Sequence, residues 1–272
     1  MGNEFRLKEY LARIGFEAKM VPDLATLSAL HAAHVAAIPF ESLDSLLGRP
    51  VSLEIAALQE KIVRGRRGGY CFEQNTLFKA ALETIGFKVT AFAGRVRWMS
   101  APDAPLSPRT HMLLKVELAD GPWLADVGFG GCLLDQPLRL ATDIEQQTPA
   151  GTYRLTEQDG LFSLAASQPG GWRTMYMFDF TRQEPSDYEM ANWFTSTNPN
   201  HVLVQNLILE RVVAGRRYKI VNRRFVVEEG GGRAIEGRNI ENADELARLL
   251  RETFDIEPPV PVEQVFSRIG PA

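Results

Sequence analysis

Apolar residues recur close to every 3.6 positions through the first 86 residues, which predicts that this part of the chain is helical. Four helices are expected, and each carries a start or stop signal. They are EFRLKEYLARIG ending on Gly15, DLATLSALHAAHVAAI capped by Asp23 and stopped by Pro39, SLEIAALQEKIVRG capped by Ser52, and CFEQNTLFKAALETIG closed by Gly86. The last of them begins on a cysteine.

From Lys88 the period changes to two, which is typical of strands. The runs KVTAFAGRVRW, HMLLKVEL, WLADV, TYRLTEQ, LFSLAAS and WRTMYMFDF are short and are separated by turn signals such as Asp159-Gly160. They predict a small antiparallel β-barrel over residues 88–185. The Pro-rich insert MSAPDAPLSPRT interrupts this region just before His111, and it is either a functional loop or a plain surface excursion.

The remaining chain mixes the two periods. SDYEMANWFTSTNPNH predicts a short helix and a polar loop, and NLILERVVAGRRYKIVNRRFVVEEGGG predicts further strands. The amphipathic helix ADELARLLRETF follows, with a start at Asn242 that resembles a capping box. The expected fold class is therefore α+β. Its parts are a helical domain at 1–87, a β-barrel domain at 88–185, an interdomain segment at 186–204 and a C-terminal α/β lid at 205–272.

Composition narrows the class of protein. The 272 residues are 45% hydrophobic, enough for a sizeable core, and 34 acidic against 30 basic residues give a net charge of −4, which argues against a nucleic-acid binder. Arg6 stands where a myristoylation signal requires Ser or Thr, and no apolar run suits a signal peptide or a membrane span. Two cysteines in so long a chain indicate a reducing compartment, so we expect a cytoplasmic protein. No metal-ligand spacing occurs.

The stretch RGGYCFEQN places Cys71 in the first turn of a predicted helix. Unpaired backbone N–H groups and the helix dipole favour an anion there, so the position favours a reactive thiolate. Gly68 and Gly69 leave room for a sharp approach turn. A buried structural cysteine is the alternative for a lone thiol.

A thiolate nucleophile needs a base and a group that orients the base. His31 and His34 lie in an Ala-rich helical run and are expected to be packed or solvent-facing, whereas His111 opens the strand HMLLKVEL and is the best candidate for the base. Asp126, in the partner strand WLADV, is expected to orient it.

Strand periodicity constrains how these two residues meet. Any hairpin loop with an even number of residues puts Asp126 on the same face as His111. A minimal loop of Asp120-Gly121 would leave them about 13 Å apart along the strand, at a rise of about 3.3 Å per residue. We therefore expect a wider loop or a bulge, the more so because Pro122 cannot donate to a ladder.

Four segments, in this order, resemble the arylamine N-acetyltransferase family of bacterial type: IPFESLD from Ile38 to Asp44, RGGYCFEQN, THMLLKV and LADVGFGG. The resemblance extends to Ser196-Thr197-Asn198-Pro199, and the last sixty or so residues fit by type only. The chain departs from the family at Ser42, where the family usually has Asn. The resemblance implies a cysteine-protease-like Cys71-His111-Asp126 core that acetylates arylamines, arylhydrazines and hydrazides. The acetyl group would come from acetyl-coenzyme A and pass through a thioester on Cys71 in a ping-pong mechanism, without a metal.

The same resemblance implies contacts for each substrate. Coenzyme A is expected at Ser107, Gly128, Gly130 and Asn200, and the amine at Phe40, Phe129, Phe194 and His201. Phe40 is otherwise a core residue. From the residues alone, Glu41 and Arg67 are either partners that fix the loop before Cys71 or two solvated charges.

Two other functions share these features. A Cys-His-Asp hydrolase or transglutaminase-like enzyme would have the same three residues, and a non-catalytic module that binds coenzyme A or an acyl carrier would keep the glycine loop while Cys71 stayed inert. The expected partners are small aromatic amines and hydrazines, with no nucleic acid and no membrane, and the protein is expected to be a monomer or a dimer.

Overall fold

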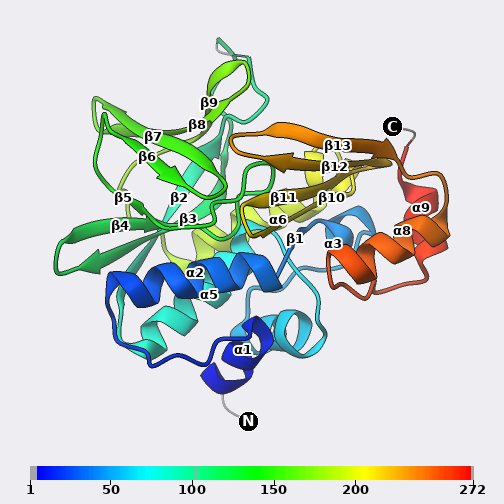
Figure 1. Ribbon diagram of the computed structural model, residues 1–272, viewed down its shortest axis with the longest axis horizontal. Coiled ribbons are helices and arrows are strands. Elements are labelled where there is room, and N and C mark those ends of the chain that lie inside the picture. The colour runs from blue at the N-terminus through cyan, green and yellow to red at the C-terminus, as the bar shows by residue number, and fades with distance from the viewer. Residues whose placement is uncertain (1–4, 102, 271–272) are drawn as a thin grey trace.

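The computed structural model describes residues 5–101 and 103–270, so Pro102 of the Pro-rich insert and Glu4 of the first predicted helix lie outside the described residues. Figure 1 shows an antiparallel barrel (green) beside a second sheet (orange and brown), with the N-terminal helices (blue and cyan) below them. The α+β fold class is confirmed.

The N-terminal part is helical, as predicted. Its elements are α1 (Leu7–Ile14), α2 (Leu24–Ala37), the two-residue strand β1 (Phe40–Glu41), α3 (Leu43–Leu46), α4 (Ile55–Leu58), the π-helix η1 (Gln59–Arg64) and α5 (Cys71–Ile85). Gly15 and Gly86 end their helices in the left-handed conformation. The Asp23 carboxylate caps α2 by accepting the Thr26 N–H at 2.8 Å.

The predicted cap at Ser52 is wrong. The helix begins at Ile55 after the extended residue Glu54, and no side chain caps it. The Ser52 hydroxyl instead accepts the Glu54 N–H at 3.2 Å, a local turn that competes with helix formation.

The barrel is an eight-stranded sheet in the order β5-β4-β3-β2-β9-β8-β7-β6. Its strands are β2 (Lys88–Val96), β3 (Arg109–Leu118), β4 (Gly121–Ala125), β5 (Leu138–Arg139), β6 (Glu145–Thr148), β7 (Gly151–Gln158), β8 (Leu161–Gln168) and β9 (Gly171–Phe178). The six predicted strands are present. The short edge strands β5 and β6 were not predicted, because Leu138–Arg139 and Glu145–Thr148 show no alternation of apolar and polar residues. In the structure the Gln146 side chain of β6 accepts the Arg139 N–H of β5 at 2.7 Å, so the two edges of the sheet meet.

The expectation of a wider loop or a bulge between β3 and β4 is wrong, because the ladder has neither. Leu118 pairs with Gly121, which leaves the two-residue loop Ala119-Asp120, and Pro122 faces Glu117 within the ladder. The loop nevertheless has an even number of residues, as the prediction that His111 and Asp126 share a face requires. Strand β4 ends at Ala125, so Asp126 has left the ladder and its side chain is free to turn back toward the start of β3.

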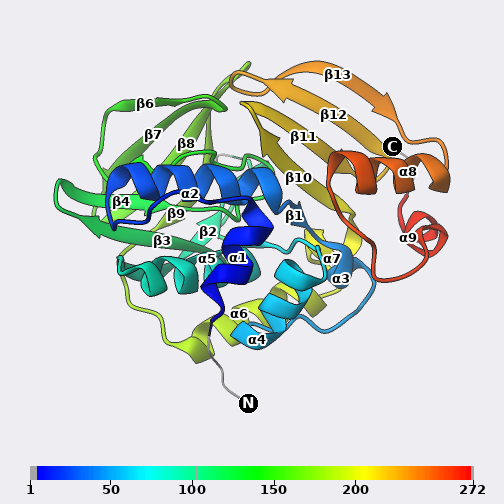
Figure 2. The ribbon, with the colours of Figure 1, turned by 60° about the horizontal axis from the view of Figure 1, so that its bottom comes forward.

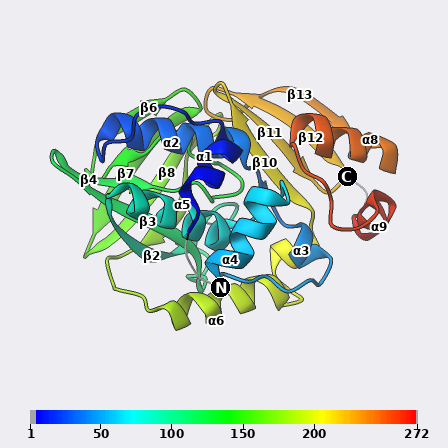
Figure 3. The same cartoon turned by 90° about the horizontal axis from the view of Figure 1, so that it is seen from below.

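The C-terminal part begins with α6 (Pro185–Thr197) and α7 (Val202–Gln205), and Figure 3 shows α6 along the outer edge of the molecule. A five-stranded sheet follows in the order β1-β10-β11-β12-β13. Its own strands are β10 (Ile208–Val213), β11 (Arg216–Val221), β12 (Arg224–Glu229) and β13 (Arg233–Asn239), and α8 (Ala243–Arg248), η2 (Leu249–Thr253) and α9 (Val262–Arg268) complete the chain. Figure 2 shows this sheet next to the barrel, with α8 and α9 on its outer side. The strand β1 therefore ties the N-terminal helices to the C-terminal sheet.

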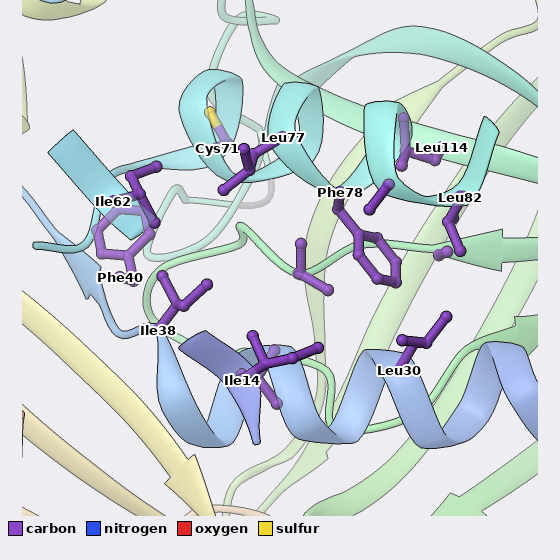
Figure 4. Packing of buried hydrophobic residues seen from close by; sticks show 14 of the residues in the cluster. Ile14, Leu30, Ile38, Phe40, Ile62, Cys71, Leu77, Phe78, Leu82 and Leu114 are labelled. Atoms are coloured by element: carbon purple, nitrogen blue, oxygen red, sulfur yellow. The ribbon is translucent and has the colours of Figure 1, made fainter. Parts of the chain in front are cut away.

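The largest core cluster lies between the N-terminal helices and the barrel. In Figure 4, Phe78 and Leu82 of α5 point toward Leu30 of α2, and Cys71 stands at the beginning of α5. Burying this apolar face fixes the axis of α5. None of the helices in the described part of the chain combines the length and the apolar character that crossing a bilayer requires.

Candidate active site

A cavity of about 270 Å³ opens at the start of α5, with mostly apolar walls. Nine of the eleven predicted site residues line it: Phe40, Cys71, Ser107, His111, Gly128, Phe129, Gly130, Phe194 and His201. Asp126 is buried behind His111, and Asn200 lies exposed on the surface beside His201. The other lining residues carry no motif that would have marked them in the sequence: Val96, Pro108, Thr110, Thr195, Val202 and Leu203.

The local backbone explains why Cys71 opens a helix. Tyr70 is extended, and the Glu73 carboxylate accepts its N–H at 3.1 Å, which caps the first turn of α5. A Cβ on Gly68 would lie 2.0 Å from the Pro39 carbonyl oxygen, so close packing requires glycine there. Cys71 is only 5% exposed, and its Sγ lies 3.5 Å from the Thr110 carbonyl oxygen.

His111 and Asp126 are in direct contact. The Nε2 atom of His111 lies 2.7 Å from Oδ2 of Asp126, which leaves Nδ1 for the Cys71 side. Burial disfavours the imidazolium ion, but the Asp126 carboxylate and the Cys71 side chain outweigh burial and raise the pKa of His111 to about 10. Burial likewise opposes ionisation of Asp126, yet His111 and hydrogen-bond donors keep its pKa below the usual value. The surroundings of the His111 ring therefore favour the imidazolium ion over the neutral imidazole.

Further groups fix the Asp126 carboxylate. Its Oδ1 atom accepts the Asn75 side-chain N–H and the Gly128 backbone N–H, both at 3.0 Å. Asn75 also donates to the Met112 carbonyl at 2.8 Å and accepts the Val127 N–H at 3.1 Å. Sequence reasoning assigned no role to Asn75, although its position four residues after Cys71 puts it on the same helix face.

Aromatic rings enclose His111. The Phe129 ring meets it edge to face at 5.1 Å between centroids, and the Tyr176 ring lies 4.5 Å away. Tyr176 of β9 was not predicted, because nothing in WRTMYMFDF separates it from a core aromatic residue. Both rings exclude water from the imidazole.

A cluster of charges supports the loop before Cys71. Arg67 and Glu41 form the ion pair that was one of the two predicted readings, at 2.6 Å from Nη2 to Oε1. Asp44 and Lys61 extend the cluster, and the Lys61 Nζ lies 2.6 Å from Oε1 of Glu73. Arg67, just before the Gly68-Gly69 turn, is thus held by Glu41, and Tyr70, just after the turn, donates its N–H to Glu73, so charged groups hold both sides of the turn.

The departure at Ser42 has its own contacts. Its hydroxyl donates to the Asn206 carbonyl at 2.8 Å and accepts the Ile208 N–H at 2.9 Å. Ser42 thus joins the segment after β1 to the start of β10.

His31 and His34 are fully buried, which is the packed alternative of the prediction. The His31 Nε2 atom accepts the Asp126 backbone N–H at 3.3 Å. The two ring nitrogens of His34 bond the Tyr10 hydroxyl at 2.8 Å and Oε1 of Gln74 at 2.7 Å. Gln74 in turn donates to the carbonyls of Pro39 and Gly69, so a neutral His34 supports the turn that precedes Cys71.

Acid should therefore destabilise the fold through these two histidines. Burial lowers the pKa of His31 to about 4 and that of His34 to about 3, against 6.5 for an exposed imidazole. The unfolded chain binds more protons below pH 6.5, so the free energy of unfolding should fall as the pH drops, by on the order of 2 kcal/mol per histidine at pH 5. Urea titrations at pH 7 and pH 5 measure this loss. His34→Gln should lose less stability than the wild type between the two pH values, and an equal loss in both proteins would contradict the assignment.

Cys71 and Cys132 are both free thiols. In the described ranges 5–101 and 103–270, no group of three or more His, Cys, Asp or Glu side chains is arranged to hold a metal ion. The side chains that the site brings together are a buried thiol, an imidazole and the carboxylate that contacts this imidazole.

Comparisons with known proteins agree with this geometry. A sequence model of a family described as N-acetyltransferase matches residues 23–261. An arylamine N-acetyltransferase of Escherichia coli is 40% identical over 251 residues, which cover 92% of this chain and 88% of the relative. The solved arylamine N-acetyltransferase of Mycobacterium smegmatis superposes with a TM-score of 0.92 at 39% identity, covering 97% of this chain and 98% of the other. The Mycobacterium marinum enzyme, solved in complex with CoA, gives a TM-score of 0.91 at 36% identity over 97% and 99% of the two chains.

Proposed function

The chain belongs to the arylamine N-acetyltransferase family, and from this premise we propose that it moves an acetyl group from acetyl-coenzyme A to an aromatic amine or hydrazine through a thioester on Cys71. The observation that carries the proposal is that Cys71, at the start of α5, lines one apolar cavity together with His111, whose ring contacts the buried Asp126 carboxylate. Family membership makes the protein an acyltransferase. The covalent route and the range of acceptors are the proposed part.

The first half-reaction forms the thioester. The Cys71 sulfur, as a thiolate beside the protonated His111, attacks the acetyl carbonyl carbon, and the bond from that carbon to the coenzyme A sulfur breaks. The proton on His111 is available to the departing thiolate. Asp126 holds the imidazole ring in one orientation and stabilises its positive charge.

The second half-reaction consumes the thioester. The amine nitrogen attacks the acetyl carbon, His111 collects the proton that the nitrogen loses, and the bond to the Cys71 sulfur breaks to release the amide. An aromatic amine suits this step because its low basicity leaves it uncharged at neutral pH. The apolar walls Phe40, Phe129 and Phe194 offer such a ring stacking surfaces and keep water from the carbonyl.

The donor thioester suits the same cavity. Gly128 and Gly130 border it, and a Cβ on Gly128 would lie 2.6 Å from the Cys71 Cα, so glycine keeps that wall close to the backbone. Ser107 also lines the cavity, and its hydroxyl donates to the Val96 carbonyl at 2.9 Å. We assign these three residues to the binding of acetyl-coenzyme A, and we assign Asn200, which is exposed and precedes the lining residue His201, to the outer part of that substrate.

Steady-state kinetics with both substrates test whether the reaction passes through the proposed thioester. If the acetyl group rests on Cys71 between the two substrates, double-reciprocal plots against acetyl-coenzyme A at several fixed arylamine concentrations should be parallel. Intersecting lines would indicate direct transfer in a ternary complex. Rapid formation of acetate without any amine would indicate a hydrolase instead.

A further inference from the structure

Glu210 of β10 is a buried carboxylate that the reaction itself does not use. Its side chain is about 1% exposed and accepts hydrogen bonds from the loop that follows Asp126. One carboxylate oxygen accepts the Gly131 N–H at 2.6 Å and the other accepts the Leu133 N–H at 2.8 Å. Hydrogen bonds from backbone N–H groups to a carboxylate are among the stronger ones in proteins.

This loop, residues 128–133, forms one wall of the cavity. Gly128, Phe129 and Gly130 line the cavity, and the Phe129 ring contacts His111. The loop packs closely against Phe40, because a Cβ on Gly130 would lie 2.4 Å from the Phe40 ring. A small shift of this loop would therefore change the distance between the Phe129 and Phe40 walls.

The same residue lies opposite the second wall. In the pairing of β1 with β10, Phe40 is the direct partner of Glu210. The strand β10 thus fixes Phe40 through its backbone and the loop through the Glu210 side chain. One residue of the C-terminal sheet, Glu210, therefore helps to position both the Phe40 wall and the wall formed by residues 128–133.

Arg217 of β11 supplies the opposite charge. Its Nε lies 3.6 Å from Oε1 of Glu210, and its other nitrogens donate to the carbonyls of Ala150 and Leu133 and to the Tyr153 hydroxyl. Leu133 is therefore held by its N–H and by its carbonyl. Removing Glu210 alone would leave a buried, unpaired guanidinium, which is costly.

We propose that Glu210, backed by Arg217, is a positioning residue that sets the width of the amine cavity by anchoring residues 128–133 to the C-terminal sheet. The inference rests on the proposed function, because it concerns the same cavity. It gives the C-terminal sheet a part in the reaction although none of its own strands β10–β13 contributes a residue to the cavity lining among the described residues.

The test is Glu210→Gln, with Glu228→Gln as the matched control. Glu228 lies in β12 of the same sheet, directly opposite Arg217, and pairs with Lys219 at 3.0 Å. It does not line the cavity, so this variant also removes a negative charge beside Arg217 but leaves the hydrogen bonds to Gly131 and Leu133 in place. An amide can accept from only one of the two N–H groups, so the loop loses an anchor. The KM for the arylamine should rise roughly tenfold, the effect expected for one lost charge-assisted hydrogen bond, while kcat stays within about threefold. The Glu228→Gln protein should match the wild type.

A second variant separates positioning from stability. Glu210→Gln with Arg217→Met removes the unpaired charge, so it should be more stable than Glu210→Gln alone while its KM stays high. If the KM returned to the wild-type value together with the stability, or if Glu210→Gln left the KM within twofold of wild type, the positioning role would be refuted.

Hydrogen exchange distinguishes a failure of this inference from a failure of the proposed function. The Gly131 and Leu133 amides should exchange faster in Glu210→Gln than in the wild type, and unchanged exchange would refute the anchor. This readout does not depend on catalysis. A wild-type protein that transferred no acetyl group would overturn the proposed function while the exchange rates still reported on Glu210.

Discussion

Replacing Cys71 with alanine should abolish acetyl transfer to arylamines, because the variant has no sulfur to carry the acetyl group. Cys132, the other thiol, is buried outside the cavity, and burial raises the pKa of its thiol, so it cannot substitute as a nucleophile. Steady-state rates with acetyl-coenzyme A and an aromatic amine measure the loss. The matched control is Cys132→Ala, which removes the other thiol and should keep most of the activity.

Measurable turnover by Cys71→Ala would contradict the covalent route. The two substrates would then react directly within one complex, and the residues around the cavity would act only by bringing them together. Circular dichroism of the variant confirms that a loss of activity is not a loss of fold.

Replacing Asp126 with asparagine should reduce the transfer rate by about 10⁴-fold, the loss that the corresponding change causes in serine proteases. The amide oxygen can still accept the hydrogen bonds from Asn75 and Gly128, so the local fold around residue 126 should be kept. It carries no charge to stabilise the His111 imidazolium, and it can select the wrong tautomer of the ring. Without the carboxylate, the pKa of His111 should fall from about 10, because the attraction that opposes burial is gone.

Asp135→Asn is the control for this change. Asp135 is another buried carboxylate, in the segment between β4 and β5, and its oxygens accept the Thr148 hydroxyl at 2.6 Å and the Ala150 N–H at 3.0 Å rather than a bond from His111. It should cost stability rather than catalysis. A soluble Asp126→Asn protein with turnover near the wild-type value would refute the assignment of Asp126.

Local signals were enough to predict the nucleophile and its helix. Cys71 follows a double glycine and precedes a clear 3.6-residue repeat, and Gly15, Asp23 and Gly86 mark their helix ends through backbone chemistry that acts within a few residues. Ser52 failed because its hydroxyl had a nearer backbone partner at Glu54. Such competition between turn and cap depends on the dihedral angles, which a sequence pattern does not contain.

The meeting of His111 and Asp126 was predicted for a partly wrong reason. The face was correct because strand side chains alternate, but the offset of the two residues along the strand was expected to require a wider loop or a bulge. The structure removes the offset by ending β4 at Ala125 and turning the chain at Asp126, which hairpin pairing rules do not anticipate.

Long-range polar contacts could not be predicted. Asn75 reaches Asp126 from α5, and Glu210 reaches Gly131 from β10, across 51 and 79 positions of the chain. Each is an ordinary polar residue in its own segment. Only the packing of the helices, the barrel and the C-terminal sheet brings these groups to the loop that follows Asp126.

The mass of the intact protein after incubation with acetyl-coenzyme A alone shows whether Cys71 carries the acetyl group. The wild type should gain the mass of one acetyl group, located on Cys71 by peptide mapping, and release one equivalent of free coenzyme A. Adding an aromatic amine should then restore the original mass and yield the acetylated amine. An unmodified protein, or an acetyl group on any residue other than Cys71, would refute the thioester on Cys71.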